Sequence, residues 1–257
     1  MATKSTILSQ KEVLLLENLI TKYGLVVTFD QIFKELKNTK SRQEIYNQVG
    51  KLSKAGWLAR ITKGVYYIAN LESRGTASVS VFALAHLLAQ DSYVSFEGAL
   101  QYHGMFDQHL RTIRSVSLKK RKIAVLQKIN YEFIKTGKKN FYGYETIWQE
   151  GQKARVATAE KTILDMLHFK RTVSAVDLIA EKLREHKYML NEKRLNQLSK
   201  KQSLAVQRIL GFLLDRADVD SNVIYNWIKG KQGYSRMTAD STRFNAKWRL
   251  YYHKHFQ

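Results

Sequence analysis

The chain has 257 residues, of which 44% are hydrophobic, so it can bury the core of one large domain or two modest ones. Its 43 Lys and Arg residues outnumber 22 Asp and Glu residues, and the net charge of +21 predicts a polyanionic partner: nucleic acid, an anionic membrane or an acidic protein. The absence of cysteine excludes disulfides, thiolate metal sites and cysteine nucleophiles. No apolar run reaches the ~20 residues of a membrane span, and the first residues lack a signal-peptide pattern, so we expect a cytoplasmic protein.

Residues 1–75 are predicted to begin with two helices. The first is expected over residues 9–23, where the apolar residues recur at helical spacing. The second begins at Thr28, because Gln31 three residues later completes a capping box. The residues expected to be buried on these helices are Val13, Leu16, Leu19, Ile20, Phe29, Ile32, Phe33 and Leu36.

A third helix and a hairpin follow. Ser41 and Glu44 form a second capping box, and Gly56 is expected to end the helix. Residues 57–61 and 65–68 then resemble two strands around a turn. The order helix, helix, turn, helix, hairpin predicts a winged helix-turn-helix.

The third helix has a single apolar stripe of Ile45, Val49 and Leu52, which leaves its opposite face free. A helix held in this way can enter the major groove of DNA. Arg suits guanine, Gln and Asn suit adenine, and Lys suits phosphates. The alternative is a protein-docking module whose polar face is merely solvated. The candidate DNA contacts are Arg42, Gln43, Tyr46, Asn47, Lys51, Lys54 and, at the hairpin tip, Lys63.

Residues 76–257 are predicted to form a larger α+β domain, with the boundary near residue 75. Strands in its middle are flanked by helices on both sides along the chain, and its last part is mainly helical. The expected strands are 112–118, 129–135, 141–148, 153–157 and 248–252, and the expected helices are 80–90, 95–103, 159–169, 173–185, 191–198, 203–216 and 222–229.

Residues 111–139 of this domain contain ten basic residues and one acidic residue, Glu132. Such a charge excess predicts a second contact with a polyanion. The alternative is a solvated sheet edge, on which lysine blocks pairing with other sheets. The possible secondary basic surface comprises Arg111, Arg114, Lys119, Lys120, Arg121 and Lys122.

Signals for catalysis are weak. The seven histidines have no metal-ligand spacing, and the chain has no phosphate-binding loop or nucleophile elbow. Glu160, Lys161 and Asp165 are a possible magnesium-dependent nuclease centre. The simpler interpretation is a helix that begins after Thr158, with Glu160 placed favourably in its first turn. We therefore expect no enzyme, no metal and no cofactor.

Short motifs along the chain resemble the AbiEi-type antitoxins. Residues 56–68 are similar to the wing of that family, and residues 95–104 are similar to its next helix. Residues 159–165 resemble its Glu-Lys-Ala-Leu-Leu-Asp helix start, although alanine stands where the family usually has proline. Residues 208–214 and 248–249 also fit, so the resemblance covers nearly the whole chain in order.

The resemblance implies a bacterial transcriptional repressor that is the antitoxin of a type IV toxin–antitoxin operon in abortive infection, a phage defence. Its winged helix would bind inverted repeats in its own promoter. Its C-terminal domain would counter a nucleotidyltransferase-like toxin without a tight complex. Carried onto this chain, the family adds Ser41 to the DNA-reading positions, and we include Arg60 beside the wing.

Two other hypotheses remain open. One is a nucleic-acid-processing enzyme that uses a winged helix as its targeting arm, and the other is a lone winged-helix regulator without a toxin. Cleavage assays with magnesium or manganese distinguish the first, and the gene neighbourhood distinguishes the second.

Overall fold

A computed structural model describes residues 7–69, 79–149 and 151–256. The chain has a mixed α+β fold with several sheets. Its contacts divide it into two compact units, which we describe separately. The first unit comprises residues 1–90, 124–130 and 147–154, and the second comprises the remainder. The domain boundary predicted near residue 75 lies outside the described residues. Within those residues, no helix is both long and apolar enough to cross a membrane.

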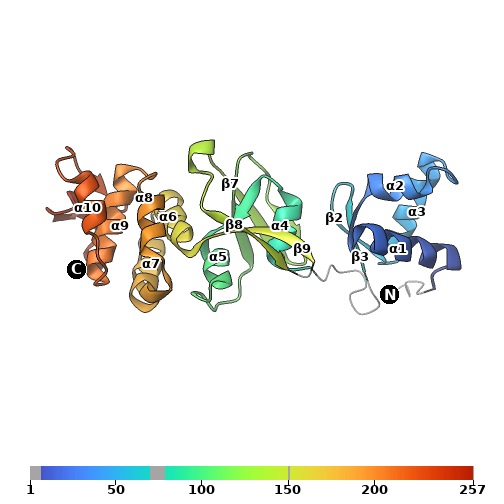
Figure 1. Ribbon diagram of the computed structural model, residues 1–257, viewed down its shortest axis with the longest axis horizontal. Helices are drawn as coiled ribbons and strands as arrows, with labels where there is room; N and C mark the ends of the chain where they lie inside the picture. Colours follow the sequence, from blue (N-terminus) through green and yellow to red (C-terminus); the bar gives the residue numbers. More distant parts are fainter. Residues whose placement is uncertain (1–6, 70–78, 150, 257) are drawn as a thin grey trace. The chain divides into compact units, whose positions relative to one another are not determined.

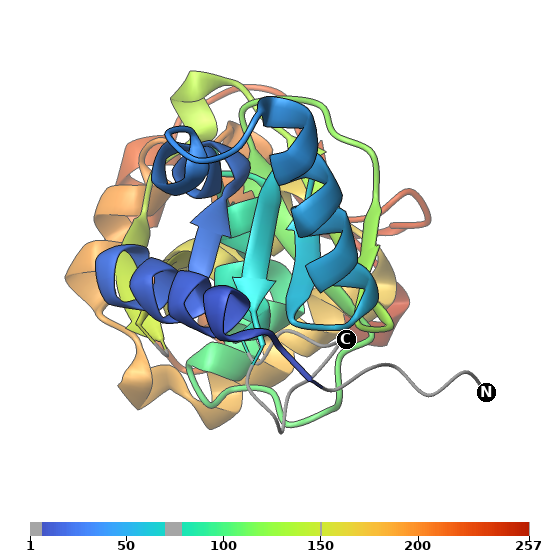
Figure 2. The same cartoon turned by 90° about the vertical axis from the view of Figure 1, so that its right-hand side faces the viewer.

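Before residue 90, the described residues of the first unit form four helices and a small sheet. The sheet has the antiparallel order β1-β3-β2, and α1 and α3 flank these strands (Figure 2). Its elements are α1 (Gln10–Tyr23), β1 (Val26–Thr28), α2 (Phe29–Leu36), α3 (Arg42–Lys54), β2 (Leu58–Thr62), β3 (Val65–Ile68) and α4 (Val81–Leu88).

The starts of these helices are confirmed. The Thr28 and Ser41 hydroxyls each accept a hydrogen bond from the backbone N–H three residues later. In return, the Gln31 and Glu44 side chains accept a hydrogen bond from the backbone N–H of the capping residue. Ser9 caps α1 in the same way. Side chains satisfy the free N–H groups at each helix start, so residues close together in the sequence determine where these helices begin. The buried cluster of this part is Leu15, Leu16, Leu19, Val27, Phe29, Ile32, Ile45, Val49, Leu52, Trp57, Leu58 and Ile68.

The predicted inner face of α1 is wrong at two positions. Val13 is 37% exposed and Ile20 is 39% exposed, whereas Leu15, Leu16 and Leu19 are buried. At 3.6 residues per turn, Val13 and Ile20 lie about 100° around the helix from the buried stripe. Val13 and Ile20 have helical spacing just as the buried leucines do, so periodicity alone did not show which residues face the core.

The hairpin β2–β3 is confirmed to within one residue. Gly64 in its turn has φ +74°, a conformation that costs glycine little because it has no Cβ. Strand β1 was not predicted. It consists of only three residues between α1 and α2 and pairs with β3.

A six-stranded mixed sheet has the order β6-β7-β5-β4-β9-β8. β4 runs antiparallel to β5 and parallel to β9. The four strands predicted in this region are confirmed with shifts at their ends, whereas the three-residue strands β4 and β6 were missed. The strands are β4 (Ser92–Val94), β5 (Thr112–Ser117), β6 (Ala124–Leu126), β7 (Ile129–Lys135), β8 (Tyr144–Gln149) and β9 (Gln152–Ala157).

The second unit contains the helices predicted after residue 91, all of which are confirmed. In Figure 1 the helices from α6 onward run from yellow to red. A three-stranded sheet of order β10-β12-β11 ends the chain; only β12 overlaps a predicted strand. These elements are α5 (Phe96–Tyr102), α6 (Ala159–Phe169), α7 (Val173–Glu185), α8 (Glu192–Ser199), α9 (Leu204–Arg216), α10 (Asn222–Ile228), β10 (Ser235–Arg236), β11 (Arg243–Asn245) and β12 (Leu250–Tyr252), with 3-10 turns at Lys138–Asn140, Lys187–Met189 and Lys254–Phe256.

Trp248 fixes this C-terminal sheet to α9. Its indole is 1% exposed and its Nε1 donates to Asp215 at 2.7 Å. A Cβ built on Gly211 would lie 2.1 Å from the Trp248 ring, so only glycine fits at that point of α9. Asp215 also accepts from Lys247 at 2.7 Å.

Candidate nucleic-acid interface

Helix α3 carries most of the predicted DNA contacts. The buried residues Ile45, Val49 and Leu52 are confirmed on its inner face. Opposite them, Gln43, Asn47 and Lys54 follow one another at helical spacing and are exposed. The Gln43 side-chain amide donates to Asn47 Oδ1 at 3.1 Å, so the two amides have a defined orientation.

A hollow of about 770 Å³ lies between α3 and the β2–β3 hairpin. Four of the predicted contacts line it: Arg42 and Tyr46 from α3, and Arg60 and Lys63 from the hairpin. Residues 14 positions or more apart in the sequence therefore meet on one concave surface. Arg42, Arg60 and Lys63 have exposed side chains, and Asp30 is the acidic residue in the lining.

Aromatic rings contact the two α3 side chains, Arg42 and Tyr46, that line this hollow. Tyr46 stacks on Phe29 with centroids 4.2 Å apart and planes 19° from parallel. The Arg42 guanidinium lies over the Phe33 ring at 5.5 Å. Contacts of this kind limit side-chain motion while the polar ends stay in solvent. Phe29, Phe33 and Tyr66 were not predicted to belong to the site; the only signal in the sequence was their aromatic character.

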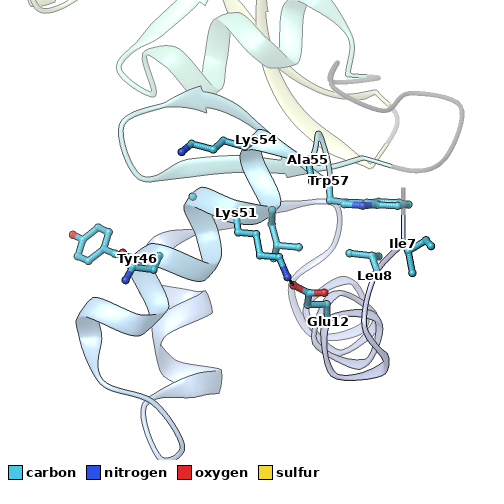
Figure 3. A pocket seen from close by; sticks show the side chains of 11 residues that line it. Ile7, Leu8, Glu12, Tyr46, Lys51, Lys54, Ala55 and Trp57 are labelled. Atoms are coloured by element: carbon cyan, nitrogen blue, oxygen red, sulfur yellow. Dashed lines mark hydrogen bonds and ion pairs between the residues drawn. The ribbon is translucent and has the colours of Figure 1, made fainter. Parts of the chain in front are cut away.

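Ser41 and Lys51 have structural partners in the same unit. Ser41 caps α3 and binds Glu44, and its hydroxyl lowers the pKa of that carboxyl. Lys51 Nζ lies 2.9 Å from Glu12 Oε1 of α1. Figure 3 shows Lys51 and Glu12 pointing toward one another across a second hollow, of about 560 Å³, while Tyr46 projects elsewhere from α3.

Glu12 is the carboxylate that fixes α1 to α3. It accepts from the Ser9 backbone N–H at 2.8 Å, from the Ser9 hydroxyl at 2.8 Å, and from Lys51. The backbone hydrogen bond from Ser9 and then the bond from Lys51 lower the pKa of Glu12 to about 2. The capping box of Ser9 and Glu12 was not predicted, and the sequence held no signal for the Glu12 partner 39 residues away.

The possible secondary basic surface is divided by ion pairing. Arg114 binds Glu97 at 3.2 Å and Glu132 at 2.9 Å, and Arg121 pairs with Asp91. These two guanidiniums are therefore partly neutralised by carboxylates. The exposed members of the predicted set are Arg111, Lys119, Lys120 and Lys122.

The structure places the three residues of the possible nuclease centre inside the second unit. Lys161 and Asp165 are 0% exposed and form an ion pair with each other. Asp165 also accepts from Tyr93 at 3.1 Å and from Ser95 at 2.8 Å. Burial raises the pKa of Asp165, while Lys161 opposes that shift.

Glu160 has different partners from Lys161 and Asp165. It is 3% exposed and accepts from the Asn191 backbone at 2.8 Å. Thr158 caps α6 as expected. Among the described residues there is no group of three or more His, Cys, Asp or Glu side chains that could hold a metal ion.

Comparison with known proteins gives a fold relationship. No family model matches the sequence, and no curated protein matches it. Among solved structures, the crystal structure of the Rv2827c protein from Mycobacterium tuberculosis is similar, with a TM-score of 0.68. The match has 12% identity and covers 98% of this chain and 94% of that one. The two chains therefore share a fold, and an identity of 12% shows the fold alone.

Proposed function

We propose that residues 9–68 form a winged helix-turn-helix that binds double-stranded DNA. In this proposal α3 is the recognition helix and the β2–β3 turn is the wing. The observation that carries the proposal is the hollow of about 770 Å³ on which Arg42, Tyr46, Arg60 and Lys63 converge. Duplex DNA presents phosphates on each side of the groove that a helix enters, so cations on both α3 and the hairpin suit it.

The exposed stripe of α3 supplies groups for reading bases. Gln43 and Asn47 carry amides, which can bond to adenine, and Arg42 carries a guanidinium, which can bond to guanine. Lys54 continues the stripe toward the end of the helix, where it can contact a phosphate. The net charge of +21 supports a polyanionic partner for the whole chain.

We further propose that the protein represses its own promoter and acts as the antitoxin of a type IV system. This part rests on the resemblance of residues 56–68, 95–104 and 159–165 to AbiEi-type antitoxins. The second unit would then counter a nucleotidyltransferase-like toxin, as the resemblance implies.

The test of DNA binding is fluorescence anisotropy with the upstream region of the protein's own gene and with a scrambled duplex of equal length, across a salt series. The proposal predicts a preference for the upstream region of ~10³-fold or more, with binding to random DNA falling steeply as salt rises. Equal binding to both duplexes would contradict the repressor.

The antitoxin part needs a separate test. Co-expression with the adjacent gene product should restore growth if that product is the toxin. Promoter binding without any rescue would leave a winged-helix regulator and contradict the antitoxin.

A further inference from the structure

A group of exposed aromatic rings lies on the small C-terminal sheet of the second unit. Phe244 of β11 pairs across from Tyr251 of β12, and Tyr251 also pairs with Arg236 of β10. Residues directly opposite one another on paired strands project from the same face of a sheet. Leu250, the neighbour of Tyr251 on the strand, is 0% exposed and belongs to the inner face.

The rings on this face touch one another; Phe244 and Tyr234 are open to solvent, and Tyr251 is half-buried. Tyr251 lies between its neighbours, with centroids 5.0 Å from Phe244 and 5.1 Å from Tyr234. Phe244 is 51% exposed and Tyr234 is 63% exposed. We call Tyr234, Phe244 and Tyr251 the aromatic face. A cluster of large exposed rings usually marks a surface that binds something.

The charge of this part of the chain favours a polyanion. Residues 229–254 contain seven basic residues, of which Lys247 pairs with Asp215, and one acidic residue, Asp240. Arg236 lies over the Tyr251 ring at 4.8 Å and donates to the Ser241 carbonyl at 2.7 Å. Arg236 also lines a hollow of about 380 Å³, together with Arg171, Met237, Thr238 and Ala239.

We propose that the aromatic face binds single-stranded nucleic acid. Unpaired bases would stack on Phe244 and Tyr234, and the phosphates would contact Arg236 and Arg171. Aromatic rings beside a basic hollow are the pattern by which proteins hold single strands. Duplex DNA fits poorly, because the faces of its bases are already stacked on neighbouring pairs. This site is separate from the duplex interface proposed for α3.

The test is fluorescence anisotropy of the full chain with labelled single strands of about 12 nucleotides, made as RNA and as DNA of the same sequence. Phe244→Ala and Tyr234→Ala should each raise the Kd for single strands by roughly five-fold or more. Their binding to the upstream duplex should be unchanged. The RNA and DNA arms show whether the sugar hydroxyl is recognised.

Three further variants test whether binding depends on these rings rather than on any exposed ring or on the α3 interface. Tyr188, which is 80% exposed in the same unit, provides a matched variant, Tyr188→Ala, that should bind single strands like the original chain. Arg42→Ala should weaken duplex binding and leave single-strand binding unchanged. Phe244→Trp should retain single-strand binding, and its added indole fluorescence should be quenched on binding.

Three results would overturn the proposal. Phe244→Ala and Tyr234→Ala could bind single strands like the original chain. Tyr188→Ala could weaken binding as much as they do, which would show that the loss of any exposed ring has this effect and that the aromatic face is not the site. Arg42→Ala could abolish single-strand binding, which would place it on α3. Failure of promoter recognition with intact single-strand binding would instead contradict the proposed repressor and support this site.

Discussion

At the scale of single residues, two glycines within helices have opposite surroundings. A Cβ on Gly211 would overlap the Trp248 ring, whereas a Cβ on Gly50 of α3 would meet nothing within 4 Å. Gly211→Ala should therefore destabilise the protein by at least about 1–3 kcal/mol, because Trp248 must move. Gly50→Ala should stabilise it by about 0.5–1 kcal/mol, because alanine favours a helix interior. Urea unfolding measures both changes, and equal signs for the two variants would contradict the packing.

Glu12 makes a pH prediction at the same scale. Its pKa falls from 4.5 to about 2 on folding, so its ionised form is bound more favourably in the folded state. That stabilisation is fully present above pH 4.5 and is lost as the pH falls toward 2. Glu12→Gln should cost about 1.5–3 kcal/mol at pH 7, the usual value of hydrogen bonds to a charged group.

The measurement for Glu12→Gln is urea unfolding from pH 7 down to the acid limit of folding. The difference in unfolding free energy from the original chain should shrink below pH 4.5. Glu17→Gln, also on α1, is the control and should show a smaller effect at pH 7, because Glu17 is exposed. A difference for Glu12→Gln that stays constant with pH would contradict the role of its charge.

Contacts between residues distant in the chain could not be predicted from the sequence, whereas contacts between near neighbours could. The capping partners Thr28 with Gln31 and Ser41 with Glu44 are three residues apart, so local pattern was sufficient. Lys51 with Glu12 and Asp165 with Tyr93 join residues distant in the chain. Their geometry exists only once the elements have packed.

At the scale of elements, long helices were predictable and short strands were not. Residues 159–169 and 173–185 have periodic apolar residues over several turns, and both helices are confirmed at those bounds. β1, β4 and β6 each contain three residues, which is too few for alternation to appear. Such strands exist because a neighbouring strand offers hydrogen bonds, and single sequences do not encode the neighbour.

The two sides of the proposed duplex interface make a prediction about salt. Lys63 lies at the hairpin turn and is exposed, so we assign it to a phosphate. Lys63→Ala should weaken binding to the upstream region and to random DNA alike and should reduce the salt slope by about 1. Lys11→Ala, an exposed lysine of α1, is the matched control and should leave the slope unchanged. Equal slopes for the original chain and Lys63→Ala would contradict the assignment of the hairpin as a wing.

At the scale of the whole molecule, charge and fold carry separate information. The excess of 43 basic over 22 acidic residues indicates a polyanionic partner, but it does not locate the contact. The mixed α+β fold was predictable from the order of the elements, because strands and helices occur in separate runs. The grouping of residues 124–130 and 147–154 with the first unit was not predictable, because it depends on contacts across long stretches of chain.

The second unit adds a consequence at this scale. Its exposed basic residues at 111–122 and its aromatic face on β10–β12 are separate in sequence and chemistry. If the proposed repressor and the proposed single-strand site are both correct, one chain binds duplex and single-stranded nucleic acid through different units. Variants on α3 should then change only the Kd for duplex DNA, and variants on the aromatic face should change only the Kd for single strands. A variant that combines both should show both changes unaltered.

The most direct test of the central claim is the base preference of Arg42→Ala. Anisotropy competition with a set of upstream duplexes, each changed at one base pair, gives the preference profile of each variant. The account predicts that Arg42→Ala loses ~1–3 kcal/mol of specific affinity and relaxes the preference at one position in each half-site. An unchanged profile and affinity would contradict α3 as the recognition helix.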